Sequence, residues 1–202
     1  MGNDPNAVLR FRITLRDLEP AVWREIEVPS DYSFWDLHVA IQDAMGWLDY
    51  HLHAFSPTGG TDTPIGIPEH EEDTEFRAGW KISVRDYFRE PGDRMRYEYD
   101  FGDGWVHDVE LVEKRPREKG IAYPRCVAGA RACPPEDCGG PHGYMELLEI
   151  LANPRHREHR AMRDWLKGHV GHYHPFDPEA FDPAAVEFWN PGERFGIAFG
   201  KG

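Results

Sequence analysis

Two runs of alternating residues, joined by a glycine-rich turn, constrain the fold more than any other stretch of this chain. Residues 94–114 read RMRYEYDFGDGWVHDVELVEK, with mostly apolar or aromatic side chains at every second position from Met95 to Phe101 and from Trp105 to Leu111. A period of two is typical of a strand that buries one face, and the GDG between the runs is a hairpin turn signal. The stretch therefore predicts a β-hairpin that covers a hydrophobic core.

A second hairpin and a helix come before it. LRFRITL (9–15) and AVWREIEV (21–28) alternate on either side of the turn-like RDLEP, which predicts two paired strands. Residues 34–45 place apolar side chains with helical spacing, and Ser33 and Gly46 are residue types that begin and end a helix. HLHAFSP (51–57) then returns to a period of two.

Two helical patterns follow, GYMELLEILAN (143–153) and HREHRAMRDWLKG (156–168). The order of elements predicts an α+β fold with a β-grasp-like mixed sheet, in which an early helix packs on a β-β-α-β core and a further β-hairpin and C-terminal helices are added. We expect a single domain over residues 1–202, with a motif core at 9–182, an acidic loop at 57–76 and a C-terminal tail at 183–202.

The charge balance bears on the kind of partner. The formal net charge of −13 at pH 7 makes this an acidic protein, whereas phosphate backbones bind through clustered Lys and Arg. Non-specific nucleic-acid binding is therefore disfavoured, whereas a protein is still a candidate for the partner.

Cysteine use and hydropathy indicate the compartment. The N-terminal MGNDPNAVLRF holds no apolar signal core, and no run of about 18 apolar residues occurs. The chain has three cysteines, and an odd number without a secretion signal favours a reducing environment. We expect a cytoplasmic protein that does not enter a membrane.

Histidines and one acid form the first candidate metal site. In a strand, His51 and His53 would point to the same face, and His107 lies in the strand that follows the turn residue Asp103. Three imidazoles and a carboxylate suit zinc, and an open coordination position would activate water. The alternative is a set of hydrogen-bonded histidines at the edge of an aromatic core.

Cysteines form the second candidate zinc site. Cys126, Cys133, Cys138 and His142 have the spacing C-x6-C-x4-C-x3-H, and three thiolates with one imidazole complete a tetrahedral shell. The alternative is a purely structural corner, in which prolines stiffen the loop and glycines allow positive φ before the next helix. The residues of that structural loop are Pro134, Pro135, Gly139 and Gly140.

Acidic residues stand close to both candidate sites. Paired carboxylates can perform acid–base work or bind divalent cations, but single acids in turns more often cap backbone N–H groups. We hypothesise that the HLH strand, the DFGD hairpin and the PPED loop converge on one pocket. Its candidate residues are His51, His53, Asp100, Asp103, Trp105, His107, Glu136 and Asp137.

These motifs carry a family resemblance. HVAIQDAMGWLDYHLHAF, YEYDFGDGWVHDVEL and YPRCVAGARACPPEDCGGPHGYMELLEIL resemble the family named after the third open reading frame of an Ri plasmid. Its members also occur as passengers of insertion sequences and are sometimes labelled resolvase-like. The resemblance runs from about Leu9 to Asp182, and it implies an α+β fold related to an archaeal protein and no established activity.

The residues argue against resolvase chemistry. A serine recombinase needs an activated serine near several arginines and a basic DNA-binding module. The serines are Ser30, Ser33, Ser56 and Ser83, and none lies in such a cluster. The sequence therefore predicts a non-catalytic interaction domain, which the family resemblance would associate with plasmids or mobile elements, and it leaves open whether a metal such as zinc stabilises the domain. The alternative is a metal-dependent hydrolase with a His/Asp site.

Overall fold

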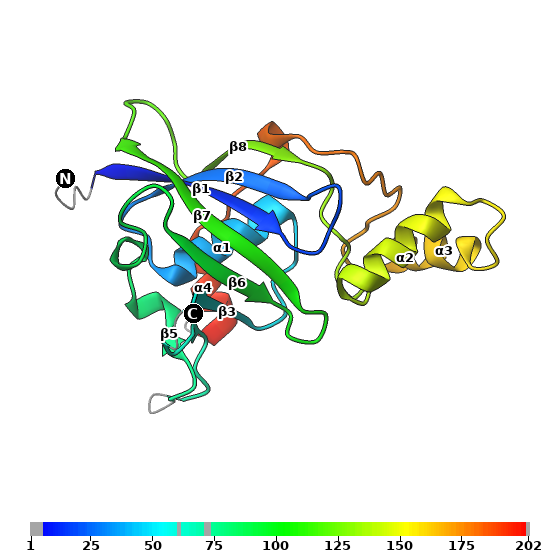
Figure 1. Cartoon of the computed structure of the whole chain (residues 1–202), viewed down its shortest axis with the longest axis horizontal. Helices are drawn as coiled ribbons and strands as arrows, with labels where there is room; N and C mark the ends of the chain where they lie inside the picture. The colour runs from blue at the N-terminus through cyan, green and yellow to red at the C-terminus, as the bar shows by residue number, and fades with distance from the viewer. Residues whose placement is uncertain (1–5, 60–61, 71–73, 201–202) are drawn as a thin grey trace.

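The protein is built on one eight-stranded sheet with the strand order β5-β4-β3-β6-β7-β1-β2-β8 (Figure 1). The structure is a computed structural model that describes residues 6–59, 62–70 and 74–200. The strands are β1 Ala7–Leu15, β2 Trp23–Pro29, β3 His53–Pro57, β4 Ile65–Gly66, β5 Arg77–Ala78, β6 Arg94–Tyr99, β7 Trp105–Pro116 and β8 Arg125–Ala130. The helices are α1 Phe34–Met45, α2 Gly140–Ala152, α3 His159–Gly168 and α4 Pro191–Phe199, with short 3-10 turns at Gly79–Lys81, Val84–Asp86 and Pro183–Ala185.

The predicted α+β class and both predicted hairpins are confirmed. β1 pairs with β2, and β6 pairs with β7, both antiparallel. The β-grasp-like arrangement is not confirmed. β1 lies between β2 and β7 and is antiparallel to both, and the strand after the helix, β3, is separated from β1 by β6 and β7. The parallel pair is β4 with β5 at the sheet edge.

Helix α1 begins and ends where its sequence predicts. The Ser33 hydroxyl accepts a hydrogen bond from the Asp36 amide at 3.2 Å, and the Asp36 carboxylate accepts one from the Ser33 amide at 2.8 Å. Gly46 ends the helix with a φ of 87°, a left-handed conformation that costs glycine little. The helix lies across one face of the sheet (Figure 1), where Phe34, Leu37 and Ile41 are buried against the strands.

Because side chains alternate along a strand, charged side chains lie on the face of the sheet opposite to α1. There the Glu27 carboxylate is fully buried and lies 2.7 Å from Arg10, 2.8 Å from Arg115 and 2.6 Å from Arg125. Burial raises the pKa of Glu27, but the hydrogen bonds from the three guanidinium groups together outweigh it and lower the pKa to about 2. One acid thus joins strands β1, β2, β7 and β8.

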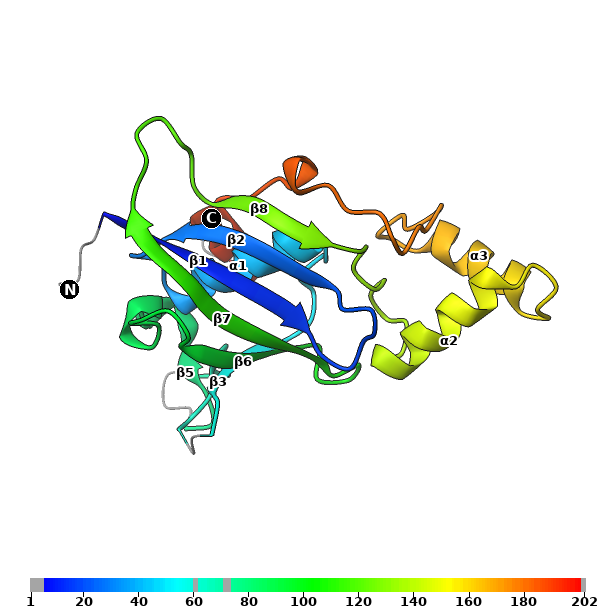
Figure 2. The same ribbon diagram turned by 45° about the horizontal axis from the view of Figure 1, so that its top comes forward.

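The helices of the C-terminal part of the chain lie in two separate places. Helices α2 and α3 lie beyond one end of the sheet, as Figures 1 and 2 show. The segment expected as a tail instead contains α4, which packs on α1 through Phe195 and Phe199, 5.6 and 5.5 Å from the Trp35 ring. In the described ranges, no helix combines the length and the apolar character needed to cross a bilayer.

Candidate functional site

Three segments far apart in the sequence meet at one end of the sheet, and we call residues 47–53, 99–103 and 133–140 together the three-block junction. The Asp100 amide donates to the Leu52 carbonyl at 3.0 Å. The Trp47 indole donates to the Pro134 carbonyl at 2.9 Å, and the Gly139 amide donates to the Asp103 carboxylate at 3.1 Å. Each segment is therefore hydrogen-bonded to both of the others.

Two glycines allow the third segment to approach the hairpin turn closely. Gly140 has a φ of +68°, and a Cβ atom there would lie 2.2 Å from the Asp103 carbonyl oxygen. Its neighbour Gly139 has a φ of +90°. Pro134 and Pro135 before them are buried. The loop can enter helix α2 against the hairpin turn only because these two positions lack side chains.

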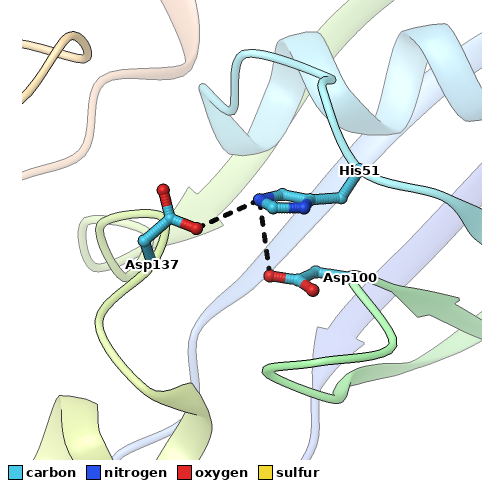
Figure 3. A group of neighbouring side chains, drawn as sticks. All are labelled: His51, Asp100 and Asp137. Carbon is cyan, nitrogen blue, oxygen red and sulfur yellow. Dashed lines mark hydrogen bonds and ion pairs between the residues drawn. The ribbon is translucent and has the colours of Figure 1, made fainter.

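His51, Asp100 and Asp137 contribute one side chain from each segment (Figure 3). The His51 Nε2 atom is 3.2 Å from Asp137 Oδ1 and 3.5 Å from Asp100 Oδ2. One ligand atom from each residue lies within 4.8 Å of the other two. An imidazole nitrogen between two carboxylates is a donor set that divalent cations use.

Asp137 is held as a carboxylate. The Tyr50 hydroxyl donates to its Oδ2 at 2.6 Å, and this bond, more than the His51 contact, lowers the pKa of Asp137. His169 Nε2 lies 3.7 Å from the same oxygen. Asp137 has a φ of 57° and Asp100 one of 54°, a region that few residues other than glycine adopt. Left-handed backbone at both acids is the kind of strain that collects at functional sites.

Glu136 has a different role from its neighbour. Its carboxylate is buried and accepts hydrogen bonds from the Tyr99 hydroxyl at 2.6 Å and from the Leu48 amide at 3.1 Å. Burial raises the pKa of Glu136. Glu136 therefore fixes the loop to the first two segments, and Asp137 is the acid that meets His51.

The structure does not bring His51, His53, Asp103 and His107 together as one ligand set. The strand β3 begins at His53, so His51 lies outside it and the two histidines do not share a face by strand periodicity. His53 is buried and stacks on His38 with ring centroids 3.4 Å apart. Asp103 instead accepts from Gly139.

His107 and Trp105 lie in the core. The His107 Nδ1 atom is 3.3 Å from the Tyr97 carbonyl, and burial lowers the pKa of His107 to about 4. Burial also lowers the pKa of His53. Trp105 is fully buried, 6.0 Å from the Trp47 ring. The rings of Trp105 and His107 both lie beside Trp47 of the junction and are closed to solvent.

The cysteine set is not assembled either. Cys126, Cys133 and Cys138 are free thiols, and His142 is exposed on α2. Among the residues that the structure describes, His51, Asp100 and Asp137 form the group of three or more potential metal ligands, and the cysteines are not in it. Burial raises the pKa of all three thiols, that of Cys138 to about 12.

Sequence reasoning missed a buried polar network under the helix. His38 Nδ1 is 2.8 Å from the Tyr97 hydroxyl, and His38 Nε2 is 2.7 Å from Asp49 Oδ1. The Gln42 amide donates to the same Tyr97 hydroxyl at 2.8 Å. The sequence does hold a sign of this network. His38 and Gln42 are polar residues four positions apart on a helix that is otherwise apolar toward the sheet.

The fold and the junction define an α+β domain in which one His/Asp cluster is assembled from three sequence motifs. The model of the plasmid pRiA4b ORF-3-like protein family matches residues 7–185, and the chain belongs to this family. It is 35% identical over 160 residues to uncharacterized protein y4hQ of Sinorhizobium fredii (strain NBRC 101917 / NGR234), a match that covers 79% of this chain and 80% of the relative.

A solved structure supports the same fold. The crystal structure of MM3350, a protein of unknown function from Methanosarcina mazei Go1, is 40% identical in sequence and superposes with a TM-score of 0.79. The comparison covers 90% of this chain and 98% of the archaeal chain. No activity is attached to either relative by its description.

Proposed function

We propose that this chain is a non-catalytic interaction domain and that the three-block junction is its contact surface for a protein partner. One observation carries the proposal. Leu48, Tyr50, Leu52 and Phe101 surround His51 and Asp100 along the chain and are 39–55% exposed. They are four of the nine large hydrophobic residues exposed in the described part of the chain, and all four belong to two segments of the junction.

The physical reason is the cost of exposed apolar area. Single exposed hydrophobic residues are ordinary, whereas a group of them rimmed by polar side chains marks an interaction site. Aromatic residues are also enriched at interfaces. The hydrogen bonds of Trp47 and Glu136 hold the backbone beneath these side chains, which lowers the ordering cost of binding.

The nature of the partner follows from charge and family. A net charge of −13 repels phosphate backbones and leaves a protein as the favoured partner. The family is named for a plasmid reading frame, which supports an association with plasmids or other mobile elements.

Site-specific photo-cross-linking tests the proposal. A photoreactive amino acid is placed at Leu52 or at Trp189, which are 55% and 53% exposed in different parts of the fold. We expect a discrete cross-linked protein at position 52 in cells that express the chain naturally, and none at position 189. The same products at both positions, or none at position 52, would reject the junction as a contact surface.

Metal-dependent hydrolysis is a second candidate function, and the His51, Asp100 and Asp137 cluster favours it. An imidazole and two carboxylates suit zinc or manganese and leave coordination positions for water. The cluster is open to solvent, since Asp137 is exposed and His51 is partly exposed.

Metal titration separates this candidate from the first. We expect one zinc or manganese ion per chain by isothermal titration, lost in His51→Ala and kept in His142→Ala, which removes an exposed histidine outside the cluster. Hydrolysis of bis(p-nitrophenyl) phosphate should then require both the ion and Asp100. Binding without hydrolysis would leave a metal-stabilised interaction domain, and equal binding by both variants would remove the cluster as a metal site.

A further inference from the structure

A groove between α2 and α3 opens beside Asp137. It encloses a cavity of about 330 Å³, at the lower end of the range for ligand sites. Leu147 and Ile150 from α2 and Met162 and Trp165 from α3 provide its apolar lining. Leu147 and Ile150 are buried, whereas Met162 and Trp165 remain half-buried. The two helices therefore leave part of their shared apolar surface uncovered.

The rim of this groove is acidic. Asp137, Glu146 and Glu158 line it, and no Lys, Arg or His is among the lining residues. Glu146 is exposed and makes no hydrogen bond or ion pair with another described residue. Glu158 lies 3.4 Å from Arg157, but both side chains are well exposed, and such a pair contributes little. The groove lining thus carries three acidic side chains and no basic one.

The position of the helices leaves the groove accessible. In Figures 1 and 2, α2 and α3 lie off the end of the sheet, away from α1 and α4. Helix α3 carries Met162, Trp165 and Leu166 on one side, and Leu166 alone of these is fully buried. Trp165 and Met162 are suited to accept a partner, since Trp is a frequent interface anchor and Met adapts its shape.

We infer that this groove binds a short basic and apolar peptide segment of a protein partner. Apolar side chains of the segment enter between α2 and α3, and its Lys or Arg side chains meet Glu146, Glu158 and Asp137. Binding of an amphipathic segment in a groove between helices is a common recognition mode, and charge complementarity selects a basic segment. The inference rests on the proposed function, because it names the chemistry of that partner, and Asp137 belongs to both surfaces.

Fluorescence anisotropy tests the inference with a defined probe. The probe is a labelled peptide of about twelve residues, with leucines along one helical face and lysines at the other positions. Glu146→Lys should weaken its binding by at least about tenfold, because the change replaces an attraction by a repulsion inside the groove. Glu149→Lys is the matched control, since Glu149 is exposed on the same helix and outside the lining, and it should change binding by less than about twofold.

Two further measurements complete the test. Met162→Asp should also weaken binding, while a peptide with glutamates in place of the lysines should not bind; circular dichroism of each variant shows whether the fold is kept. Equal weakening by Glu146→Lys and Glu149→Lys, or no binding of the basic peptide, would overturn the inference. A cross-link at Leu52 without peptide binding would reject the groove alone, and peptide binding without that cross-link would reject the junction surface alone.

Discussion

Replacing Glu27 by glutamine should lower the free energy of unfolding by about 3 kcal/mol, since it removes the buried carboxylate that three guanidinium groups share. The Glu27 carboxylate is fully buried among Arg10, Arg115 and Arg125. A neutral amide in its place would leave three cations close together with no central acid. Urea unfolding at neutral pH measures the effect.

The matched control is Glu25→Gln on the same strand. Glu25 meets Arg12 at 3.1 Å, and both side chains are partly exposed, so its loss should cost no more than about 1 kcal/mol. The pKa of Glu27 is lowered from 4.5 to about 2, and its contribution is therefore present above pH 4.5 and lost as pH falls toward 2. Equal costs for the two variants at neutral pH would contradict the role given to Glu27.

Between pH 6.5 and about 4, acid should destabilise the protein through its buried histidines. Burial lowers the pKa of His107 from 6.5 to about 4, so the folded state binds fewer protons than the unfolded chain between these values. The contribution of His107 to stability is fully present above pH 6.5 and falls by about 3 kcal/mol as the pH drops toward 4. His53 shifts in the same direction and adds to the loss.

The variant His107→Phe tests this assignment. It keeps an aromatic ring beside Trp47, which lies 5.4 Å from the His107 ring, and it removes the titration. Free energies of unfolding measured between pH 7 and pH 4 should fall less steeply in this variant than in the natural chain, and His142→Phe should leave the slope unchanged. The same slope in all three proteins would show that His107 does not set the acid response.

Local patterns predicted the parts of the fold that depend on neighbouring residues. The alternation in 94–114 gave strands that the structure has as β6 and β7, and the cap residues Ser33 and Gly46 gave α1 its ends. The predicted β-grasp-like strand order was not confirmed. The neighbours of β1 depend on its pairing with β7, more than ninety residues away in the chain. The α4 helix was missed for a similar reason, since its aromatic residues pack on Trp35.

The sequence motifs contain the three residues of the His/Asp cluster but do not predict its geometry, and three other candidates, His53, Trp105 and His107, are buried in the core. The three motifs supply His51, Asp100 and Asp137, which the structure brings together. Strand periodicity misassigned the partner of His51, because β3 begins at His53. The link between Tyr50 and Asp137 spans 87 residues, and no local spacing in a sequence fixes a contact of that range.

Cross-linking in two variant backgrounds tests most directly whether the three segments present one contact surface. The photoreactive residue stays at Leu52, and the second change is Phe101→Asp in another segment of the junction or Trp189→Asp away from it. Both replaced residues are exposed, so neither change leaves a cavity in the core. A single surface predicts that Phe101→Asp abolishes the cross-link and that Trp189→Asp leaves its yield unchanged. Equal yields in both backgrounds would contradict the account.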